Sequence, residues 1–216
     1  MITDYRIRYK LRYVPEYYDG LSEQQLKDRK TITDFKKGIY DDEICEWFSE
    51  TIMNIMKGED LEYIVCFIPS SKGDEKTIKR YSKLYEYLNI VLFCKVYLND
   101  IGYVGYKPTK HSTGNHFENY NLAISADHFY GKRVILIDDV LTTGRTFNEI
   151  AKMLEDFGAA NVTGVFLGRT IHPDLPISEE YAQKKQKILE ERKLLRENQN
   201  KYNNIKKLYK SNNNEI

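Results

Sequence analysis

Cysteine is scarce in this chain, and none of its three cysteines has the C-x-x-C spacing of a redox or zinc site. Cys45, Cys66 and Cys94 lie inside apolar stretches, which favours small buried side chains in a reducing compartment. Long apolar runs are also missing: the longest, near residues 63–68, is far below the roughly 20 residues of a membrane-spanning helix. The opening segment MITDYRIRYK contains no apolar core of the signal-peptide kind. We therefore expect a cytoplasmic protein without a membrane anchor.

The chain has no large excess of charge of either sign, because 33 Lys and Arg residues face 32 Asp and Glu residues. This balance gives no general electrostatic reason to bind nucleic acid or membranes. A local exception is the segment 5–14, in which Arg6, Arg8, Lys10 and Arg12 alternate with apolar or aromatic residues. Strict alternation predicts a half-buried strand. Its cations either contact nucleic acid or, as is more common, protect a solvated edge strand against aggregation.

Apolar runs and helical patterns alternate through the middle of the chain. At 216 residues with 41% hydrophobic content, the chain can form one well-buried domain. Buried strands are expected at residues 63–68, 90–97, 134–137 and 162–167. Helices are expected at residues 21–30, 41–58, 76–88 and 146–157. The alternation predicts an α/β protein with a parallel sheet and right-handed crossovers. The irregular segment 99–130 is typical of a loop that is functional or disordered.

The last part of the chain is rich in Lys, Glu, Asn and Gln. Apolar or aromatic residues recur there every seven positions, at Tyr181, Ile188, Leu195, Tyr202 and Tyr209. The remaining positions of a coiled-coil seam are mostly polar, which favours a solvated or partner-docked helix with a disordered end over an independent coiled coil. The predicted organisation is a strand and helix region at 1–60, an α/β core at 61–177 and a charged helical tail at 178–216.

The stretch VILIDDVLTTGRTF, residues 134–147, joins a buried strand to the start of a helix. Its threonines offer hydroxyl donors, Gly144 lets a backbone approach closely, and the helix N-terminus presents unpaired amide groups. These features suit a phosphate, although this stretch has neither the GxxxxGK[ST] spacing nor a GxGxxG fingerprint. The preceding acids, Asp138 and Asp139, would repel a lone phosphate. A sugar phosphate satisfies both features, because carboxylates accept hydrogen bonds from vicinal ribose hydroxyls while a divalent cation relieves the repulsion.

The segment VILIDDVLTTGRT resembles, position by position, the phosphoribosyl pyrophosphate (PRPP) motif of type I phosphoribosyltransferases. A looser resemblance extends over residues 62–170. It is closest to the ComF-like branch, although the zinc-finger cysteines of many ComF proteins are absent. The resemblance implies the parallel-sheet type I phosphoribosyltransferase fold, with an N-terminal hood region at 1–60 and a C-terminal helical tail.

The resemblance also implies roles for individual residues. The 5′-phosphate is expected at Thr142, Thr143, Gly144, Arg145 and Thr146. Asp138 and Asp139 are expected to hold the ribose as catalytic residues and to contact Mg²⁺ indirectly, through ribose hydroxyls or water. Pyrophosphate is expected at a loop that could otherwise be an ordinary polar turn, namely at Ser70, Ser71, Lys72 and Gly73.

In this family a long loop closes over PRPP and supplies basic residues, and here it corresponds to residues 105–119. Lys110 is the catalytic candidate, and Lys107, His111 and His116 are alternatives among which the sequence does not choose. A metal site at the two histidines is disfavoured, because no carboxylate or Cys stands at ligand spacing. Contacts to the base or to pyrophosphate are expected at Gly168, Arg169 and Thr170.

The implied activity is Mg²⁺-dependent transfer of 5-phosphoribosyl from PRPP to a nitrogen acceptor, with release of pyrophosphate. Thr142 stands where 6-oxopurine salvage enzymes carry an acid, and Arg145 replaces a frequent Lys, which disfavours hypoxanthine–guanine salvage. The alternative is a non-catalytic PRPP- or nucleotide-binding protein with a regulatory, nucleic-acid-linked or defence-associated role on the same fold. A homodimer is a further expected assembly, and a nucleic-acid or protein partner is less favoured.

Overall fold

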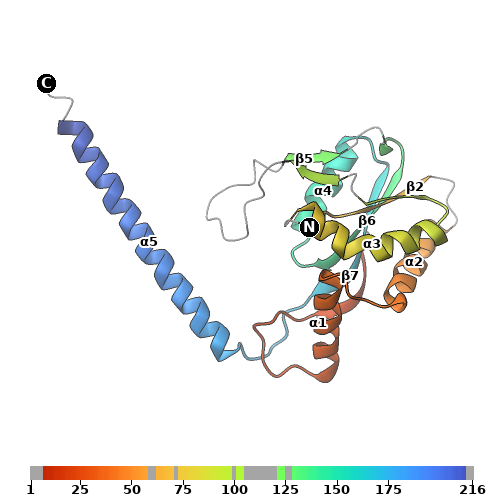
Figure 1. Cartoon of the computed structure of the whole chain (residues 1–216), viewed down its shortest axis with the longest axis horizontal. Helices are drawn as coiled ribbons and strands as arrows, with labels where there is room; N and C mark the ends of the chain where they lie inside the picture. Colours follow the sequence, from red (N-terminus) through yellow and green to blue (C-terminus); the bar gives the residue numbers. More distant parts are fainter. Residues whose placement is uncertain are drawn as a thin grey trace. The chain divides into compact units, whose positions relative to one another are not determined.

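The computed structural model describes residues 7–57, 62–70, 73–98, 101–104, 121–124 and 128–212. Its centre is a five-stranded sheet in the order β1-β7-β6-β2-β3, in which every neighbouring pair is parallel (Figure 1). The strands are β1 (Ile7–Tyr13), β2 (Tyr63–Phe67), β3 (Lys95–Tyr97), β6 (Arg133–Leu141) and β7 (Asn161–Thr170). The predicted α/β class with a parallel sheet is therefore confirmed.

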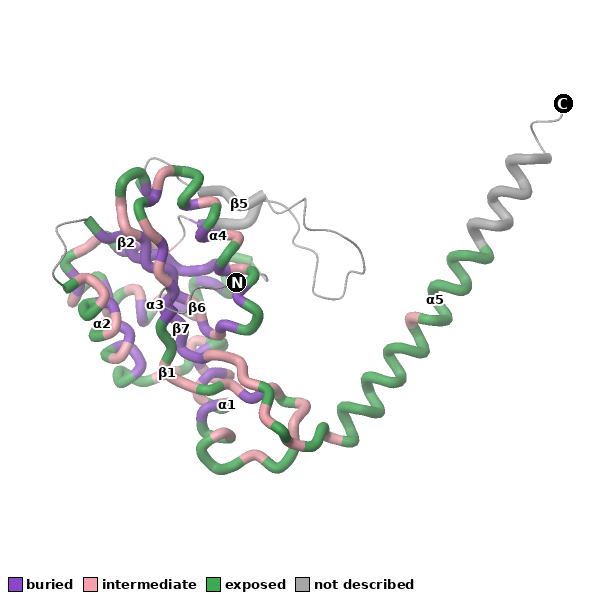
Figure 2. Tube along the Cα trace, turned by 180° about the vertical axis from the view of Figure 1, so that it is seen from behind, coloured by how far each residue is buried: buried purple, intermediate pink, exposed green. Residues whose placement is uncertain are grey.

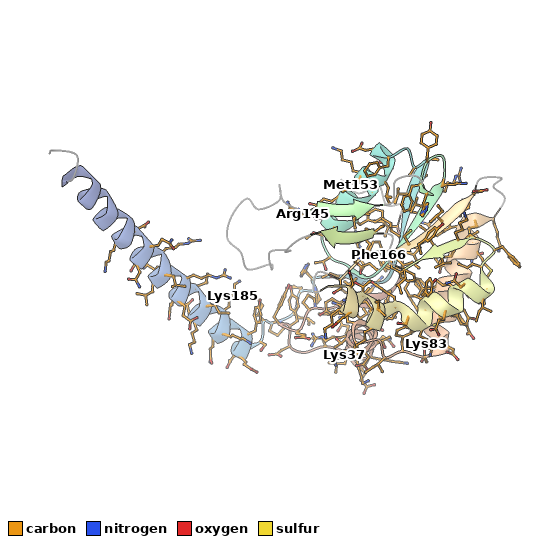
Figure 3. All side chains as sticks on the ribbon, turned by 45° about the horizontal axis from the view of Figure 1, so that its top comes forward. Lys37, Lys83, Arg145, Met153, Phe166 and Lys185 are labelled. Atoms are coloured by element: carbon orange, nitrogen blue, oxygen red, sulfur yellow. The ribbon has the colours of Figure 1, made fainter. Side chains whose placement is uncertain are left out.

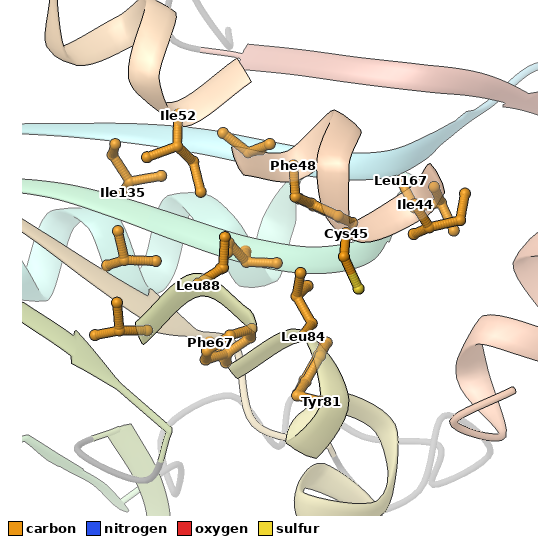
Figure 4. Close-up of a cluster of buried hydrophobic side chains, with 14 of the residues drawn as sticks. Ile44, Cys45, Phe48, Ile52, Phe67, Tyr81, Leu84, Leu88, Ile135 and Leu167 are labelled. Atoms are coloured by element: carbon orange, nitrogen blue, oxygen red, sulfur yellow. The ribbon is translucent and has the colours of Figure 1, made fainter. Parts of the chain in front are cut away.

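Helices cover both faces of this sheet. They are α1 (Glu23–Lys36), α2 (Asp42–Met56), α3 (Asp74–Val91) and α4 (Arg145–Asp156). Side chains of α1, α2 and α3 share one hydrophobic cluster with alternate residues of β2, β6 and β7, such as Phe67, Ile135 and Leu167 (Figure 4). Side chains of α4 share a second cluster with the intervening strand residues, such as Leu136 and Phe166. Burial on both faces explains why these strands are continuous apolar runs.

The helix starts follow local capping signals. Ser22 and Gln25 form a capping box that starts α1, and Asp41 accepts a hydrogen bond from the Ile44 amide at the start of α2. The expected helix 21–30 in fact extends to Lys36, because its later residues bury apolar side chains such as Phe35 against the sheet. The polar composition of this segment predicted a short helix, and packing against the sheet explains the longer α1.

Other predicted elements also differ from the structure. Strand β6 continues beyond Ile137 through both acids to Leu141, because β7 offers pairing partners as far as Arg169. Residues 90–91 belong to α3 rather than to a strand. Within the segment 99–130, β4 (Ile101–Val104) and β5 (Asn121–Ile124) form an antiparallel pair, a structure that the aperiodic sequence did not indicate.

Strand β1 forms one edge of the sheet and pairs with β7, as expected of an alternating edge strand. Its Arg8 and Arg12 are exposed, while Ile7 is buried. The N-terminal segment thus contributes a strand to the central sheet, and the role of residues 1–60 as a hood remains a prediction.

The chain divides into two units, and the second unit contains residues 16–21 and 174–216. Within it, the Ser178 amide donates to the Tyr17 carbonyl at 2.9 Å, and the rings of Tyr17 and Tyr181 lie 4.9 Å apart. These contacts hold the start of the long helix α5 (Glu179–Asn212) against the short N-terminal segment. The predicted boundary between the α/β core and the helical tail, at residue 178, remains a prediction.

Helix α5 is exposed along most of its described length (Figure 2). Its heptad residues Ile188 and Leu195 are 39% and 66% exposed, so they contribute little to burial. The expected tail helix is present, and the structure contains nothing that covers it among the described residues. Every helix in the described ranges is too short or too polar to span a membrane.

Candidate functional site

The candidate site lies where β2, β6 and β7 end at a common edge of the sheet. Parallel strands place their carboxyl ends, and the loops that follow, side by side. The Ile68 amide donates to the Ile137 carbonyl at 2.8 Å, which continues the β2–β6 contact beyond the strand. The hydroxyl oxygens of Thr142 and Thr170 lie 3.0 Å apart and join the ends of β6 and β7. Residues predicted for phosphate, ribose and base contacts therefore meet at one edge.

The two acids lie near the end of β6, and both interact with the helices on the α1–α3 side of the sheet. Oδ1 of Asp138 accepts hydrogen bonds from the Tyr81 hydroxyl at 2.9 Å and from the Asp139 amide at 2.8 Å. Asp139 is 8% exposed. Neither carboxylate caps α4, because the N-cap residue of that helix is Gly144. The acids are thus held as a pair facing α3.

Arg80 of α3 is the main counter-ion of this pair. Its Nη1 lies 2.6 Å from Oδ2 of Asp139 and 3.6 Å from Oδ1 of Asp138. Lys36, at the end of α1, places Nζ 3.8 Å from Oδ1 of Asp139. Two carboxylates and two cations therefore share one partly buried cluster.

Sequence reasoning did not assign a role to Arg80 or Tyr81. A signal was present, because the buried residues of α3 include Thr77, Tyr81 and Leu84, and position 80 lies on the same helical face. A cation on a buried stripe needs a partner. The sequence did not reveal which acid would meet it.

Burial changes the proton affinities in this cluster. Burial, reinforced by the charge of Asp139, raises the pKa of Asp138 to about 7, although Arg80 opposes the shift. Burial and the charge of Asp138 raise the pKa of Tyr81 well above its ordinary value. Tyr81 therefore stays protonated and donates a hydrogen bond at neutral pH, while Asp138 changes its protonation state near pH 7.

The predicted phosphate loop, residues 142–146, leads directly into α4. Gly144 adopts a left-handed conformation, with φ 73° and ψ 2°, and this N-cap residue makes no side-chain cap hydrogen bond. Thr142 and Thr143 are exposed. The start of α4 follows a glycine N-cap and lies beside the exposed hydroxyls of Thr142 and Thr143. Backbone amides and hydroxyls are the donors that a phosphate requires.

Arg145, labelled in Figure 3, takes a different orientation from a simple phosphate ligand. Its Nε lies 2.9 Å from Oε1 of Glu149, one turn along α4, and its amide donates to Oγ1 of Thr143 at 3.4 Å. Its guanidinium is thus paired within the helix. A contact between this side chain and a phosphate remains a prediction.

The predicted pyrophosphate loop is described in part. Ser70 is 5% exposed, and its amide donates to Oγ1 of Thr77 at 2.8 Å. Gly73 has φ +101° and starts α3. Ser71 and Lys72 lie outside the described residues. Ser70 and Gly73 bring the loop from β2 to the helix that carries Arg80.

The predicted closing loop at residues 105–119 also lies outside the described residues. Its candidates, Lys107, Lys110, His111 and His116, therefore remain predictions. The residues that flank it are paired, as Val104 and Asn121 are partners in the β4–β5 ladder. This pairing places Val104 and Asn121 side by side.

The residues predicted to follow the last core strand, Gly168, Arg169 and Thr170, instead belong to β7, which extends to Thr170, and they make separate contacts. A Cβ on Gly168 would lie 2.4 Å from Cδ1 of Ile32, so this glycine is explained by the close packing of α1 on β7. The Arg169 guanidinium lies 5.7 Å from the centre of the Tyr9 ring. Thr170 reaches a phosphate-loop residue, through Thr142.

A directly ligated metal does not fit the observed donor set. Among the described residues, no three His, Cys, Asp or Glu side chains gather as a metal site. Asp138 and Asp139 supply the hard oxygen donors that Mg²⁺ prefers, but Arg80 already lies 2.6 Å from Asp139. The indirect contact through a ligand's hydroxyls or water remains a prediction.

Comparison with known proteins supports the resemblance to phosphoribosyltransferases. Residues 82–187 match the family model of the phosphoribosyl transferase domain. The matched residues make up just under half of the chain and are similar to a phosphoribosyltransferase domain. The resemblance predicted from the motif of β6 is thereby confirmed, and the matched range contains both acids and the whole phosphate loop.

Individual relatives of this domain match over short segments. The chain is 46% identical to Competence protein F of Haemophilus influenzae over 43 residues, which are 20% of this chain and 19% of the relative. It is 49% identical to Bifunctional protein PyrR of Actinobacillus pleuropneumoniae over 55 residues, 25% of this chain and 31% of the relative. The matches therefore span less than a third of either curated relative.

Among solved structures, a hypoxanthine phosphoribosyltransferase of Staphylococcus aureus is similar to this chain at 18% identity and a TM-score of 0.41. The similarity covers 67% of this chain and 76% of that protein.

Replacing Gly144 with valine is expected to weaken sugar-phosphate binding by about tenfold or more, because a β-branched residue disfavours positive φ and crowds the helix start. The fold should lose only about 1–3 kcal/mol. Titration calorimetry with ribose 5-phosphate and a urea melt measure the two effects. Gly131→Val, at another left-handed glycine with open space around it, is the matched control for strain alone. Equal binding losses in both variants would contradict the phosphate assignment.

Proposed function

We propose that this protein binds PRPP and transfers its 5-phosphoribosyl group to a nitrogen acceptor, a base or an amine, with release of pyrophosphate. The observation that carries the proposal is the position of a partly buried carboxylate pair one short loop before a helix start whose N-cap residue is Gly144. A phosphate binds the helix start, and vicinal hydroxyls bind the carboxylates. PRPP has both groups on one sugar.

In the proposed reaction the acceptor nitrogen attacks C1 of the ribose, and the bond between C1 and the pyrophosphate oxygen breaks. Pyrophosphate leaves with the electron pair, and the acceptor loses a proton after the new C–N bond forms. Asp138 and Asp139 hold the ribose hydroxyls and stabilise the positive charge that develops on the ring. The amides and hydroxyls of residues 142–146 anchor the 5′-phosphate and fix the sugar.

Mg²⁺ is the proposed cofactor, and when bound it neutralises the leaving pyrophosphate. Asp138 and Asp139 would contact it indirectly. Ser70, Ser71, Lys72 and Gly73 are proposed to bind pyrophosphate. Closure of residues 105–119, with Lys110 as the proposed cation, would exclude water from the reactive sugar. A cytoplasmic location and a homodimer are part of the same proposal.

A non-catalytic PRPP or nucleotide sensor is the second candidate function. It is favoured by the ion pairs that already engage both carboxylates, since Arg80 lies 2.6 Å from Asp139. A ligand must share or displace these contacts. A site in which the acids are neutralised in this way can bind a sugar phosphate without stabilising a cationic transition state.

Pyrophosphate release decides between the two candidates. The full chain is incubated with PRPP and Mg²⁺ and with a panel of nucleobases and amines, and the double variant Asp138→Asn, Asp139→Asn is the negative control. Acceptor-dependent release that is lost in the double variant supports the transferase. Calorimetric binding of PRPP without release supports the sensor, and absence of binding overturns both.

A further inference from the structure

The acid pair of β6 is already provided with positive charge by the protein itself. Arg80 lies within 2.6 Å of Asp139 and 3.6 Å of Asp138, and Lys36 lies 3.8 Å from Asp139. With both acids ionised, the two cations balance the two carboxylates. The repulsion between acids and phosphate is therefore reduced before any ligand or metal arrives.

Arg80 is held firmly in this position. Its side chain is 15% exposed, its Nη1 lies 3.4 Å from the Tyr81 hydroxyl, and its guanidinium stands 5.4 Å from the centre of the Tyr81 ring. Tyr81 also donates to Asp138 at 2.9 Å. Adjacent residues of α3 thus fix both carboxylates, one through charge and the other through a hydroxyl.

One hydrogen-bond donor of Arg80 is not used within the described residues. Its Nε is buried and has no hydrogen-bond partner within the described residues. A buried donor without a partner is unfavourable unless a ligand or water completes it. This unsatisfied donor lies in the same guanidinium that contacts the predicted ribose site.

We propose that Arg80 is a positioning residue and a built-in counter-ion, which lets a sugar phosphate bind at Asp138 and Asp139 without a divalent cation. This inference rests on the proposed function and deepens it, because it separates binding of the sugar phosphate from the pyrophosphate chemistry assigned to Mg²⁺. Arg80 orients Asp139 toward the ribose hydroxyls and offsets the charge of both acids. The divalent cation is then needed only when pyrophosphate is present.

Other cations on the same helices provide matched controls. Lys83 of α3 pairs with Asp42 at 2.9 Å, and Lys37, after α1, lies 3.8 Å from Asp34 (both lysines are labelled in Figure 3). Each is about half exposed, with side-chain exposures of 47% and 59%. Removing either charge lowers the positive charge of the protein equally, without touching the acid pair.

The test is calorimetric titration of the full chain with ribose 5-phosphate, in EDTA and again in Mg²⁺. The unchanged protein is expected to bind with similar affinity in both, within about threefold. Arg80→Met and Arg80→Gln should bind about tenfold more weakly in EDTA, with part of the loss restored by Mg²⁺, because removing a charged partner of a carboxylate has an effect of this order. Arg80→Lys should recover most of the affinity, and Lys83→Met should behave as the unchanged protein.

A thermal melt of each variant separates binding from folding, and Arg80→Gln decides the question where Arg80→Met does not fold. If the unchanged protein binds ribose 5-phosphate only with Mg²⁺, or if Arg80→Gln binds as tightly as the unchanged protein in EDTA, the inference is overturned while the proposed function stands. If the unchanged protein binds neither ribose 5-phosphate nor PRPP under any condition, both are overturned.

Discussion

Asp139→Asn is expected to lower the affinity for PRPP by about ten- to hundredfold and to lower the melting temperature as well. A charged acceptor of a hydrogen bond contributes about 1.5–3 kcal/mol, which gives the expected loss of binding. The melting temperature falls because Arg80, 2.6 Å from Asp139, would lose the charge of its nearest partner. Removing one member of a buried ion pair leaves the other insufficiently compensated.

Titration calorimetry with PRPP and Mg²⁺, and a thermal melt, measure the two effects separately. Asp42→Asn is the matched control, because Asp42 pairs with Lys83 at 2.9 Å but is 73% exposed. Exposed ion pairs contribute about 0–1 kcal/mol, so this variant should keep its affinity and nearly all of its stability. Unchanged PRPP affinity in both Asp138→Asn and Asp139→Asn would mean that the motif of β6 has been misinterpreted.

The central layers of the fold were predictable from the sequence because burial on both faces leaves a simple pattern. Strand β2 is a short, continuous apolar run, β7 has an apolar middle, and the phosphate loop follows β6 as the motif predicts. The errors arose at element ends, where tertiary contacts decide. Strand β6 keeps polar residues in its ladder because β7 pairs with them up to Arg169.

The predicted site was incomplete for a physical reason. Tyr81 and Asp138 are separated by 57 positions in the sequence, and their contact depends on how α3 packs across β2 and β6. No local pattern encodes that contact. The motif identified the acids and the anion cradle, whereas their counter-ion and hydroxyl donor became visible only once α3 was placed on the sheet.

Asp138→Asn is expected to have the opposite effect on stability from Asp139→Asn above neutral pH. Burial and the charge of Asp139 raise the pKa of Asp138 from an ordinary 3.8 to about 7 in the folded protein. Between these two values the folded state binds more protons than the unfolded state. The free energy of unfolding therefore falls as the pH rises from about 4 to about 7, and it reaches a plateau above that.

Asparagine removes the fall in the free energy of unfolding with rising pH, because it cannot ionise. Its side-chain oxygen can still accept hydrogen bonds from Tyr81 and from the Asp139 amide. The variant should match the unchanged protein within about 1 kcal/mol near pH 4.5 and exceed it by about 1–3 kcal/mol at pH 8. Urea unfolding at both pH values measures the difference. Two results would contradict the assignment of the raised pKa to Asp138. One is a variant that is less stable than the unchanged protein at pH 8, and the other is a variant whose free energy of unfolding differs from that of the unchanged protein by the same amount at both pH values. The same variant should bind PRPP about tenfold or more weakly at pH 8, because the ionised carboxylate that lowers stability is the one that accepts the ribose hydroxyl.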